Sequence, residues 1–221
     1  MKISDSTISI LRNFSDINAN ILFKPGKKLS TVSTMKNIMA EANVEEEFET
    51  EFGVYDLPEF LRAVDLFDKS ELSFNGGQSL AIKDANGKQS IKYYFADKSV
   101  VVAPTKMINM PDKYVTFSLK KDVFEKLMKG VTTLNLPDIA VTGDGKEIKL
   151  VATDKKTPSS NDYSIVVGET DKTFKAYFKT ENFKMIQDDY DVAISSQKIS
   201  HFINRNKPIQ YWVAIEPDSE F

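Results

Sequence analysis

A recurring unit, one helix-like stretch followed by several strand-like segments, constrains the fold of this chain more than any single residue does. Three of the helix-like stretches begin at positions 56, 118 and 180, so each begins 62 residues after the one before. In all three an aromatic strand end leads into a polar helix start: FGVYDLPEFL, VTFSLKKDVF and AYFKTENFKM. This repetition predicts two domains of matching layout.

The sequence predicts four helices, each with apolar side chains that recur every three or four residues. The first covers about residues 4–18, the second has Pro58 in its first turn, the third ends or loosens at Gly130, and the fourth is short. Polar residues suited to a helix start mark the four beginnings: Ser4 or Asp5, Asp56, Ser118 and Thr180. Two helices therefore fall in each half of the chain.

Strand-like runs, several of them separated by Asn-Gly or Asp-Gly turns, lie between the helices. They are residues 47–55, 71–74, 79–83, 90–95, 114–117, 139–141, 147–152, 163–167, 173–178, 190–195 and 209–215. The pattern indicates an α+β protein with mostly antiparallel sheets and helices on one face of the sheets. A segment with two prolines and no periodicity separates the halves, so we expect domains at 1–97 and 113–221 and a linker at 98–112.

Several kinds of catalytic and metal site are excluded by residue content. The 221 residues include no cysteine, which rules out disulfides, thiolate zinc sites, iron–sulfur centres and cysteine nucleophiles. The single histidine, His201, lies among alternating apolar residues, and we expect it to face solvent from a strand. No phosphate-binding glycine loop is present, and the run Glu45, Glu46 and Glu47 is typical of a solvated face. The sequence therefore predicts neither an enzyme nor a bound cofactor or metal.

The charge of the chain is nearly balanced but unevenly placed. A total of 29 Lys and Arg against 32 Asp and Glu gives a net charge of −3, which on its face argues against nucleic-acid binding. Residues 37–61, however, contain no Lys or Arg and many acidic residues, so the net charge hides a polarised surface. No stretch approaches the ~20 apolar residues of a membrane span. Because the chain has no cysteine, we expect a reducing compartment such as a cytoplasm.

The helix faces opposite the apolar stripes carry positive charges. The cations on these faces are Arg12, Arg62, Lys120, Lys121, Lys126, Lys129 and Lys184. Taken singly, such residues are more often part of an ordinary solvated face, and Asp5, Asp16, Asp65 and Glu125 share the same faces. Both interpretations stay open on the residues alone.

Two matching domains, each with two helices laid on antiparallel sheets, resemble the DNA polymerase sliding clamps. Four segments are similar to those of the sliding clamps of T4-like bacteriophages: ISDSTISILRNFSDINANI, MAEANVEEEFETEFGVYDLPEFL, SVVVAPTKMINMP and YWVAIEPDSEF. The resemblance runs from end to end of the chain and is thinner over residues 137–199. It implies a homotrimeric ring with four helices per subunit around a central hole and the sheets as the outer wall.

The resemblance also implies a function without catalysis. The ring would encircle duplex DNA without reading its sequence and would tether the replicative DNA polymerase, which gives processivity in phage DNA replication. The residues that would face DNA are Lys2, Arg12, Arg62, Lys120, Lys121, Lys126, Lys129 and Lys184. The resemblance further implies two kinds of partner, an ATP-driven clamp loader and late-transcription factors. The location that it implies is the cytoplasm of the infected bacterium.

A second surface implied by the resemblance is a pocket for short peptides, such as the C-terminal peptide of the DNA polymerase. The exposed apolar candidates for it are Val101, Val102, Pro104, Met107 and Ile108 in the linker and Trp212, Val213, Ile215 and Pro217 near the C-terminus. For Val213 and Ile215 a place in the core of a strand is an equal alternative.

Two other classes of protein compete with the clamp interpretation. A structural or adaptor β-rich phage protein would share the repeats but would not encircle DNA. A hydrolase with paired Asp and Glu residues is disfavoured, because no pair of carboxylates stands out from the solvated background.

Overall fold

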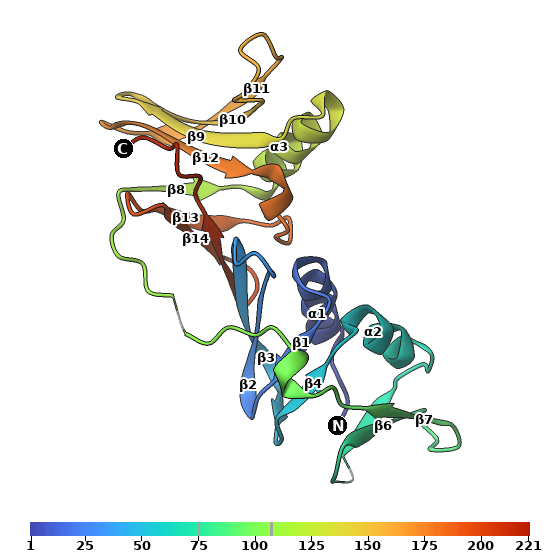
Figure 1. Ribbon diagram of the computed structural model, residues 1–221. Helices are drawn as coiled ribbons and strands as arrows, with labels where there is room; N and C mark the ends of the chain where they lie inside the picture. Colours follow the sequence, from blue (N-terminus) through green and yellow to red (C-terminus); the bar gives the residue numbers. More distant parts are fainter. Residues whose placement is uncertain (75, 107) are drawn as a thin grey trace. The chain divides into compact units, whose positions relative to one another are not determined.

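The computed structural model describes residues 1–74, 76–106 and 108–221 (Figure 1). The chain forms two compact units, Met1–Lys106 and Met107–Phe221, which we call the N-terminal and C-terminal units. The boundary between them falls inside the segment 98–112 that the sequence predicts as a linker. No helix in the described ranges is long and apolar enough to cross a membrane.

The N-terminal unit places two α-helices, α1 and α2, side by side (Figure 1). Its described strand pairs are antiparallel: β1 with β4, β2 with β3, and the three-stranded sheet β5-β6-β7. The elements are α1 Asp5–Ile17, β1 Ile21–Phe23, β2 Gly26–Val32, β3 Ile38–Phe48, β4 Phe52–Val54, α2 Leu57–Asp65, β5 Glu71–Phe74, β6 Ser79–Lys83, β7 Ser90–Tyr94 and the 3₁₀ turn η1 Lys98–Val100.

The C-terminal unit contains one α-helix among its described residues, and this helix, α3, packs against β10 and β11. One antiparallel sheet has the order β11-β10-β9-β12, and in another β13 pairs with β8 and β14, and β14 with β15. The elements are β8 Val115–Leu119, α3 Lys121–Leu134, β9 Asp138–Asp144, β10 Glu147–Thr153, β11 Tyr163–Glu169, β12 Thr173–Lys179, the 3₁₀ turn η2 Thr180–Asn182, β13 Tyr190–Ile194, β14 Ile199–Asn204 and β15 Ile209–Ala214. The prediction of an α+β protein with mostly antiparallel sheets is confirmed.

The first two helices begin where the sequence predicts. The Ser4 hydroxyl oxygen accepts a hydrogen bond from the backbone N–H of Thr7 at 3.3 Å, and Asp56 Oδ1 accepts one from the N–H of Glu59 at 2.7 Å. Both are N-caps that satisfy donors in the first turn of a helix, and Pro58 occupies a first-turn position where its missing N–H costs nothing. Each helix then buries one apolar stripe.

The third helix has its N-cap position two residues later than predicted, at Lys120 in place of Ser118. Ser118 belongs to β8, and α3 starts at Lys121 without a side-chain cap from Lys120. Its Lys121 N–H instead donates to Asp189 Oδ1 at 2.7 Å, so a residue distant in sequence supplies the missing acceptor. Local patterning could not reveal this cap.

Gly130 neither ends nor loosens α3, which continues to Leu134 and closes at Asn135 in the left-handed conformation. A Cβ atom at position 130 would lie 2.5 Å from a ring carbon of Tyr163 on β11. The glycine therefore allows the helix backbone and the tyrosine ring to approach closely.

The predicted fourth helix is wrong, because only the three-residue turn η2 forms at Thr180–Asn182. After it, two buried tyrosines satisfy the backbone: the Tyr190 hydroxyl donates to the carbonyl of Ile186 at 2.5 Å, and the Ile186 N–H donates to the Tyr211 hydroxyl at 3.4 Å. Burial raises the pKa of both tyrosines above the ordinary range, so both hydroxyls stay protonated. Hydrogen bonds to residues distant in sequence thus take the place of helical ones, and the described part of the C-terminal unit has one α-helix where two were predicted.

The list of predicted strands lacks β1, β2 and most of β3, and of β14 only the strand position of His201 was expected. The expected single strand at 47–55 is also two strands, because residues 49–51 separate β3 from β4. Lysines in β2 and glutamates in β3 lower the local β-propensity. In β3, however, Val44, Glu46 and Phe48 are buried and alternate with exposed Asn43, Glu45 and Glu47, as in a strand with one buried face.

Glu46 corrects the interpretation of the glutamate run as a solvated face, because it is only 8% exposed whereas Glu45 and Glu47 are exposed. Its carboxylate accepts hydrogen bonds from the Thr7 hydroxyl and the Ser4 N–H, and so fastens the start of α1 to β3. Burial alone would raise the pKa of Glu46, but these hydrogen bonds outweigh it and hold the pKa below the ordinary value of 4.5.

We expect Glu46→Gln to flatten the acid limb of the stability profile. Because folding lowers the pKa of Glu46, the carboxylate contributes stability at neutral pH that is lost as the pH falls below about 4.5. The free energy of unfolding of the variant should therefore lie below that of wild type at pH 7, and the gap should narrow steadily as the pH falls below about 4.5. Urea titration at pH 7 and at several acidic pH values measures this, and Glu47→Gln, on the exposed face, should follow wild type. A constant gap between wild type and Glu46→Gln would refute the assignment.

Candidate DNA-facing and peptide-binding surfaces

All eight cations that the sequence assigns to a DNA-facing surface are exposed, but three of them do not lie within helices. Lys2 precedes α1 and forms an isolated antiparallel bridge with Glu71 of β5, and Lys184 follows the turn η2. Lys120 occupies the position before the first turn of α3. Arg12 lies on α1 and Arg62 on α2, and the remaining three, Lys121, Lys126 and Lys129, lie on α3.

An ion pair joins the two helices of the N-terminal unit. Arg12 Nη2 donates to both carboxylate oxygens of Asp65, at 2.9 and 2.7 Å. Both side chains are about half exposed, at 58% and 46%, so the pair adds little to stability. It does lower the positive potential that Arg12 can present to a phosphate, because the carboxylate lies on the same surface.

Two lysines of α3 form ion pairs along their own helix. The distance from Lys121 Nζ to Glu125 is 3.8 Å, and Lys126 Nζ donates to Asp122 at 3.1 Å. The bond from Lys126 holds the pKa of Asp122 below its ordinary value. Both pairs have the four-residue spacing of helical neighbours, so the sequence alone contains the signal for them.

The remaining cations differ in how far acidic groups neutralise them. Lys2 lies 3.3 Å from Glu71, and Lys120 lies 3.9 Å from Asp189. The side chains of Arg62 on α2 and Lys129 on α3 form no hydrogen bond or ion pair with another residue in the part of the chain that the structure describes. These two side chains are thus the most available to bind an external anion.

The residues predicted to form the peptide pocket differ in how far they are buried. Val101, Val102, Pro104 and Ile108 are half-buried, Pro217 is exposed, and Met107 lies outside the described residues. Within the N-terminal unit, Val101 packs close to Gly53, where a Cβ atom would lie 3.0 Å from a Val101 methyl carbon.

The expectation that Trp212 is exposed is wrong, and for Val213 and Ile215 the alternative of a buried place in the core is the correct one. Their exposed fractions are 5%, 0% and 5%: Trp212 and Val213 belong to β15, which pairs with β14, and Ile215 directly follows β15. Trp212 stacks on His201 of the neighbouring strand with ring centroids 4.6 Å apart. Direct contact with a bound peptide would require movement of these side chains.

His201 is half-buried, which corrects its expected solvent-facing position. In addition to the stacking on Trp212, its Nε2 lies 2.9 Å from Gln210 Oε1. Burial lowers the pKa of His201, so the ring is neutral at physiological pH. The ring acts as a packing element of the sheet.

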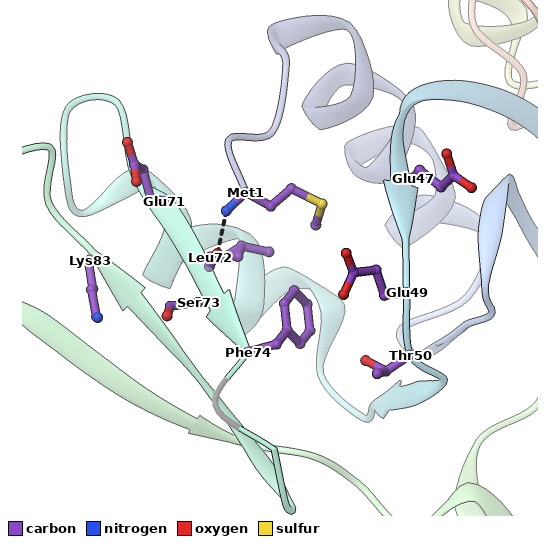
Figure 2. Close-up of a pocket in the computed structure, with 9 residues that line it drawn as sticks. All are labelled: Met1, Glu47, Glu49, Thr50, Glu71, Leu72, Ser73, Phe74 and Lys83. Carbon is purple, nitrogen blue, oxygen red and sulfur yellow. Dashed lines mark hydrogen bonds between the residues drawn. The ribbon is translucent and has the colours of Figure 1, made fainter.

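A cleft of about 520 Å³ in the N-terminal unit was not anticipated from the sequence. Figure 2 shows the side chains of Met1, Glu49 and Phe74 turned toward one another across it. Glu47 and Glu71 also line the cleft, and Lys83 is the lysine among the lining residues. This excess of carboxylates does not suit a phosphate backbone, so the cleft is separate in character from the helix cations.

Solved structures define the fold class. A crystal structure of the PCNA2–PCNA3 complex from Sulfolobus tokodaii matches with a TM-score of 0.64 at 13% identity, covering 98% of this chain and 99% of that one. The proliferating cellular nuclear antigen from Entamoeba histolytica matches with a TM-score of 0.67 at 11% identity, covering 96% and 95%. The chain has the fold of the sliding clamps.

Sequence comparison then gives the family. Residues 3–103 match the family described as DNA polymerase processivity factor, and residues 116–217 match the family described as gp45 sliding clamp, C terminal. The sliding clamp of Vibrio phage KVP40 is 33% identical over 98% of this chain and 99% of its own length. Those of Escherichia phage RB69 and Enterobacteria phage T4 are each 29% identical over 99% of this chain and 98% of theirs.

The chain belongs to the family of phage sliding clamps, the processivity factors of DNA polymerase. The resemblance to the clamps of T4-like phages is thereby confirmed. Proteins of this family are scaffolds and not enzymes, in agreement with the sequence prediction.

Proposed function

We propose that three copies of this chain close into a ring around duplex DNA and tether the replicative DNA polymerase, so that the polymerase stays on its template in phage DNA replication. The observation that carries the proposal is the similarity to phage sliding clamps over 98% of the chain. The exposed cations on α1, α2 and α3, set against the exposed glutamates of β3, support it further.

Arg62, Lys129 and the paired cations on the three helices contact DNA phosphates in this proposal, and no base edge is read. Each phosphate neutralised contributes about −0.9 to the slope of log affinity against log salt. Because several of these cations already have acidic partners, individual contacts are weak. Weak contacts allow the ring to slide, while its closed topology retains it on DNA.

Ring closure requires a head-to-tail contact that repeats three times. Among the described strands, β7 and β11 lie at the ends of their sheets, and each carries an exposed apolar residue, Tyr94 at 65% and Val166 at 52%. Open strand edges with apolar side chains are suited to pairing with another chain. We therefore assign the contacts between subunits to such edges.

A partner peptide, such as the C-terminal peptide of the polymerase, binds beside the linker in this proposal. Ile108 is its apolar anchor point there, because it is half-buried in a segment without regular structure. We expect Ile108→Ala to weaken binding of the cognate polymerase peptide by about tenfold, measured by calorimetry. Asn109→Ala, an exposed polar neighbour, should leave it unchanged. Equal affinities for Ile108→Ala and wild type, with the trimer intact, would remove Ile108 from the pocket.

Solution mass and topological retention on DNA test the ring itself. Light scattering should give about three times 25.0 kDa at concentrations where the trimer holds together. With ATP and the cognate clamp loader, the protein should remain on nicked circular DNA and leave once the circle is cut. A structural or adaptor protein would not be retained on the DNA, either before or after the circle is cut. We also propose that the protein acts in the host cytoplasm and binds late-transcription factors.

A further inference from the structure

The start of the linker is held by two asparagine side chains that follow α1. Asn20 Oδ1 accepts a hydrogen bond from the backbone N–H of Val102 at 2.8 Å, and Asn18 Nδ2 donates to the Val102 carbonyl at 3.3 Å. Both polar groups of the Val102 backbone are thus satisfied by side chains from more than 80 positions earlier in the chain. We call Asn18 and Asn20 the asparagine clasp.

The clasp is itself fixed to the end of α1. Asn18 is 5% exposed, and its backbone N–H donates to the Phe14 carbonyl at 2.9 Å as the C-cap of the helix. Its side chain also donates to the Val32 carbonyl at 2.8 Å and accepts from the Asn20 N–H at 3.1 Å. With its amide group fully used, Asn18 has little freedom to move apart from the helix.

The other end of the linker has a second anchor within the C-terminal unit. The Asp112 carboxylate accepts hydrogen bonds from the Ser195 hydroxyl, the Ser196 N–H at 3.3 Å and the Ser196 hydroxyl at 3.2 Å. Between the two anchors, residues 103–106 and 108–111 form no hydrogen bond with any other described residue. The segment 98–112 is therefore held at Val102 and at Asp112.

We propose that the asparagine clasp sets where the peptide-binding part of the linker begins. Residues up to Val102 are fastened to the N-terminal unit, and only the residues after Val102 can adjust to a partner peptide. Asn18 and Asn20 are then positioning residues, because they act on the partner through Val102. The purpose assigned to the clasp rests on the proposed peptide site, but the clasp itself can be tested without any peptide.

Amide hydrogen exchange in the full-length protein tests the clasp directly. In wild type, the Val102 amide should exchange at least about tenfold more slowly, relative to its intrinsic rate, than those of Thr105 and Lys106. Asn20→Ala should remove this protection, and Asn20→Asp should restore it, because a carboxylate oxygen can accept the same bond. Protection that is absent in wild type, or that survives in Asn20→Ala, would overturn the inference.

Calorimetry with a synthetic peptide of the last twelve residues of the cognate DNA polymerase tests the positioning role. Asn20→Ala should bind it about 3- to 10-fold more weakly than wild type, with recovery in Asn20→Asp and a midpoint of thermal unfolding lowered by no more than a few degrees. Loss of Val102 protection without loss of affinity would overturn the positioning role. Failure of wild type to bind the peptide would refute the proposed peptide site, while the exchange rates would still decide the clasp.

Discussion

The double variant Arg62→Glu/Lys129→Glu is expected to be loaded onto nicked circular DNA at least about tenfold less well than wild type. These two side chains form no ion pair with another described residue, so each can bind a phosphate without first leaving a carboxylate. Reversal of both charges places repulsive groups where phosphates would pass, in all three subunits of the proposed ring. The retained fraction after gel filtration measures the effect, and the salt dependence of binding should become less steep by about 0.9 for each phosphate that the variant no longer neutralises.

A matched control separates the helix faces from net charge. Lys88 and Lys156 are also exposed, but they lie between strands and outside the helices. Lys88→Glu/Lys156→Glu changes the net charge by the same amount and should be retained as wild type is. Equal losses in the two double variants would show that overall charge, and not the helix surface, governs loading, and would refute the assignment of Arg62 and Lys129.

Phe52→Ala is expected to lower the free energy of unfolding by about 3–5 kcal/mol, since it removes a buried ring and leaves a cavity. The ring of Phe52 is 1% exposed and stacks on Phe23 with centroids 4.5 Å apart. It also contacts Phe95 at 4.9 Å and Phe74 at 5.3 Å, so it joins β4 to the sheet β5-β6-β7 and to the residues that follow. Chemical denaturation measures the decrease in stability.

Tyr55→Ala provides the control for Phe52→Ala, because Tyr55 is a nearby aromatic residue that is 63% exposed. We expect it to change the free energy of unfolding by less than about 0.5 kcal/mol. A decrease at Phe52 no greater than that at Tyr55 would mean that the aromatic cluster is not a centre of stability in the N-terminal unit.

Local chemistry explains which elements could be predicted. Ser4 and Asp56 are N-caps whose hydrogen bonds reach only three residues along the chain, so the sequence contains the whole signal. The absence of the fourth helix could not be predicted in this way. The backbone of Ile186 bonds to the hydroxyls of Tyr190 and Tyr211, which lie on β13 and β15. Glu46 is similar, because its partners Ser4 and Thr7 are about 40 positions away.

The candidate surfaces, too, could be predicted where the signal is local and could not where it depends on residues distant in sequence. Residue type and helical spacing predicted an exposed set of cations on α1, α2 and α3, and also contained the pairing of Lys126 with Asp122. The pairing of Arg12 with Asp65 spans 53 positions and needed the packing of α1 on α2. The burial of Trp212 could not be predicted, because it depends on strand pairing that joins it to His201.

The turn at Thr180–Asn182 has a consequence for the symmetry of the proposed ring. Three subunits of two equivalent domains would repeat the inner lining six times per revolution. In the described part of the chain, however, the N-terminal unit contains two α-helices and the C-terminal unit one. The lining of the proposed ring would therefore repeat only three times. A duplex that rotates as it passes through would then meet a potential with a period of 120°, with helix-rich and helix-poor sectors in alternation.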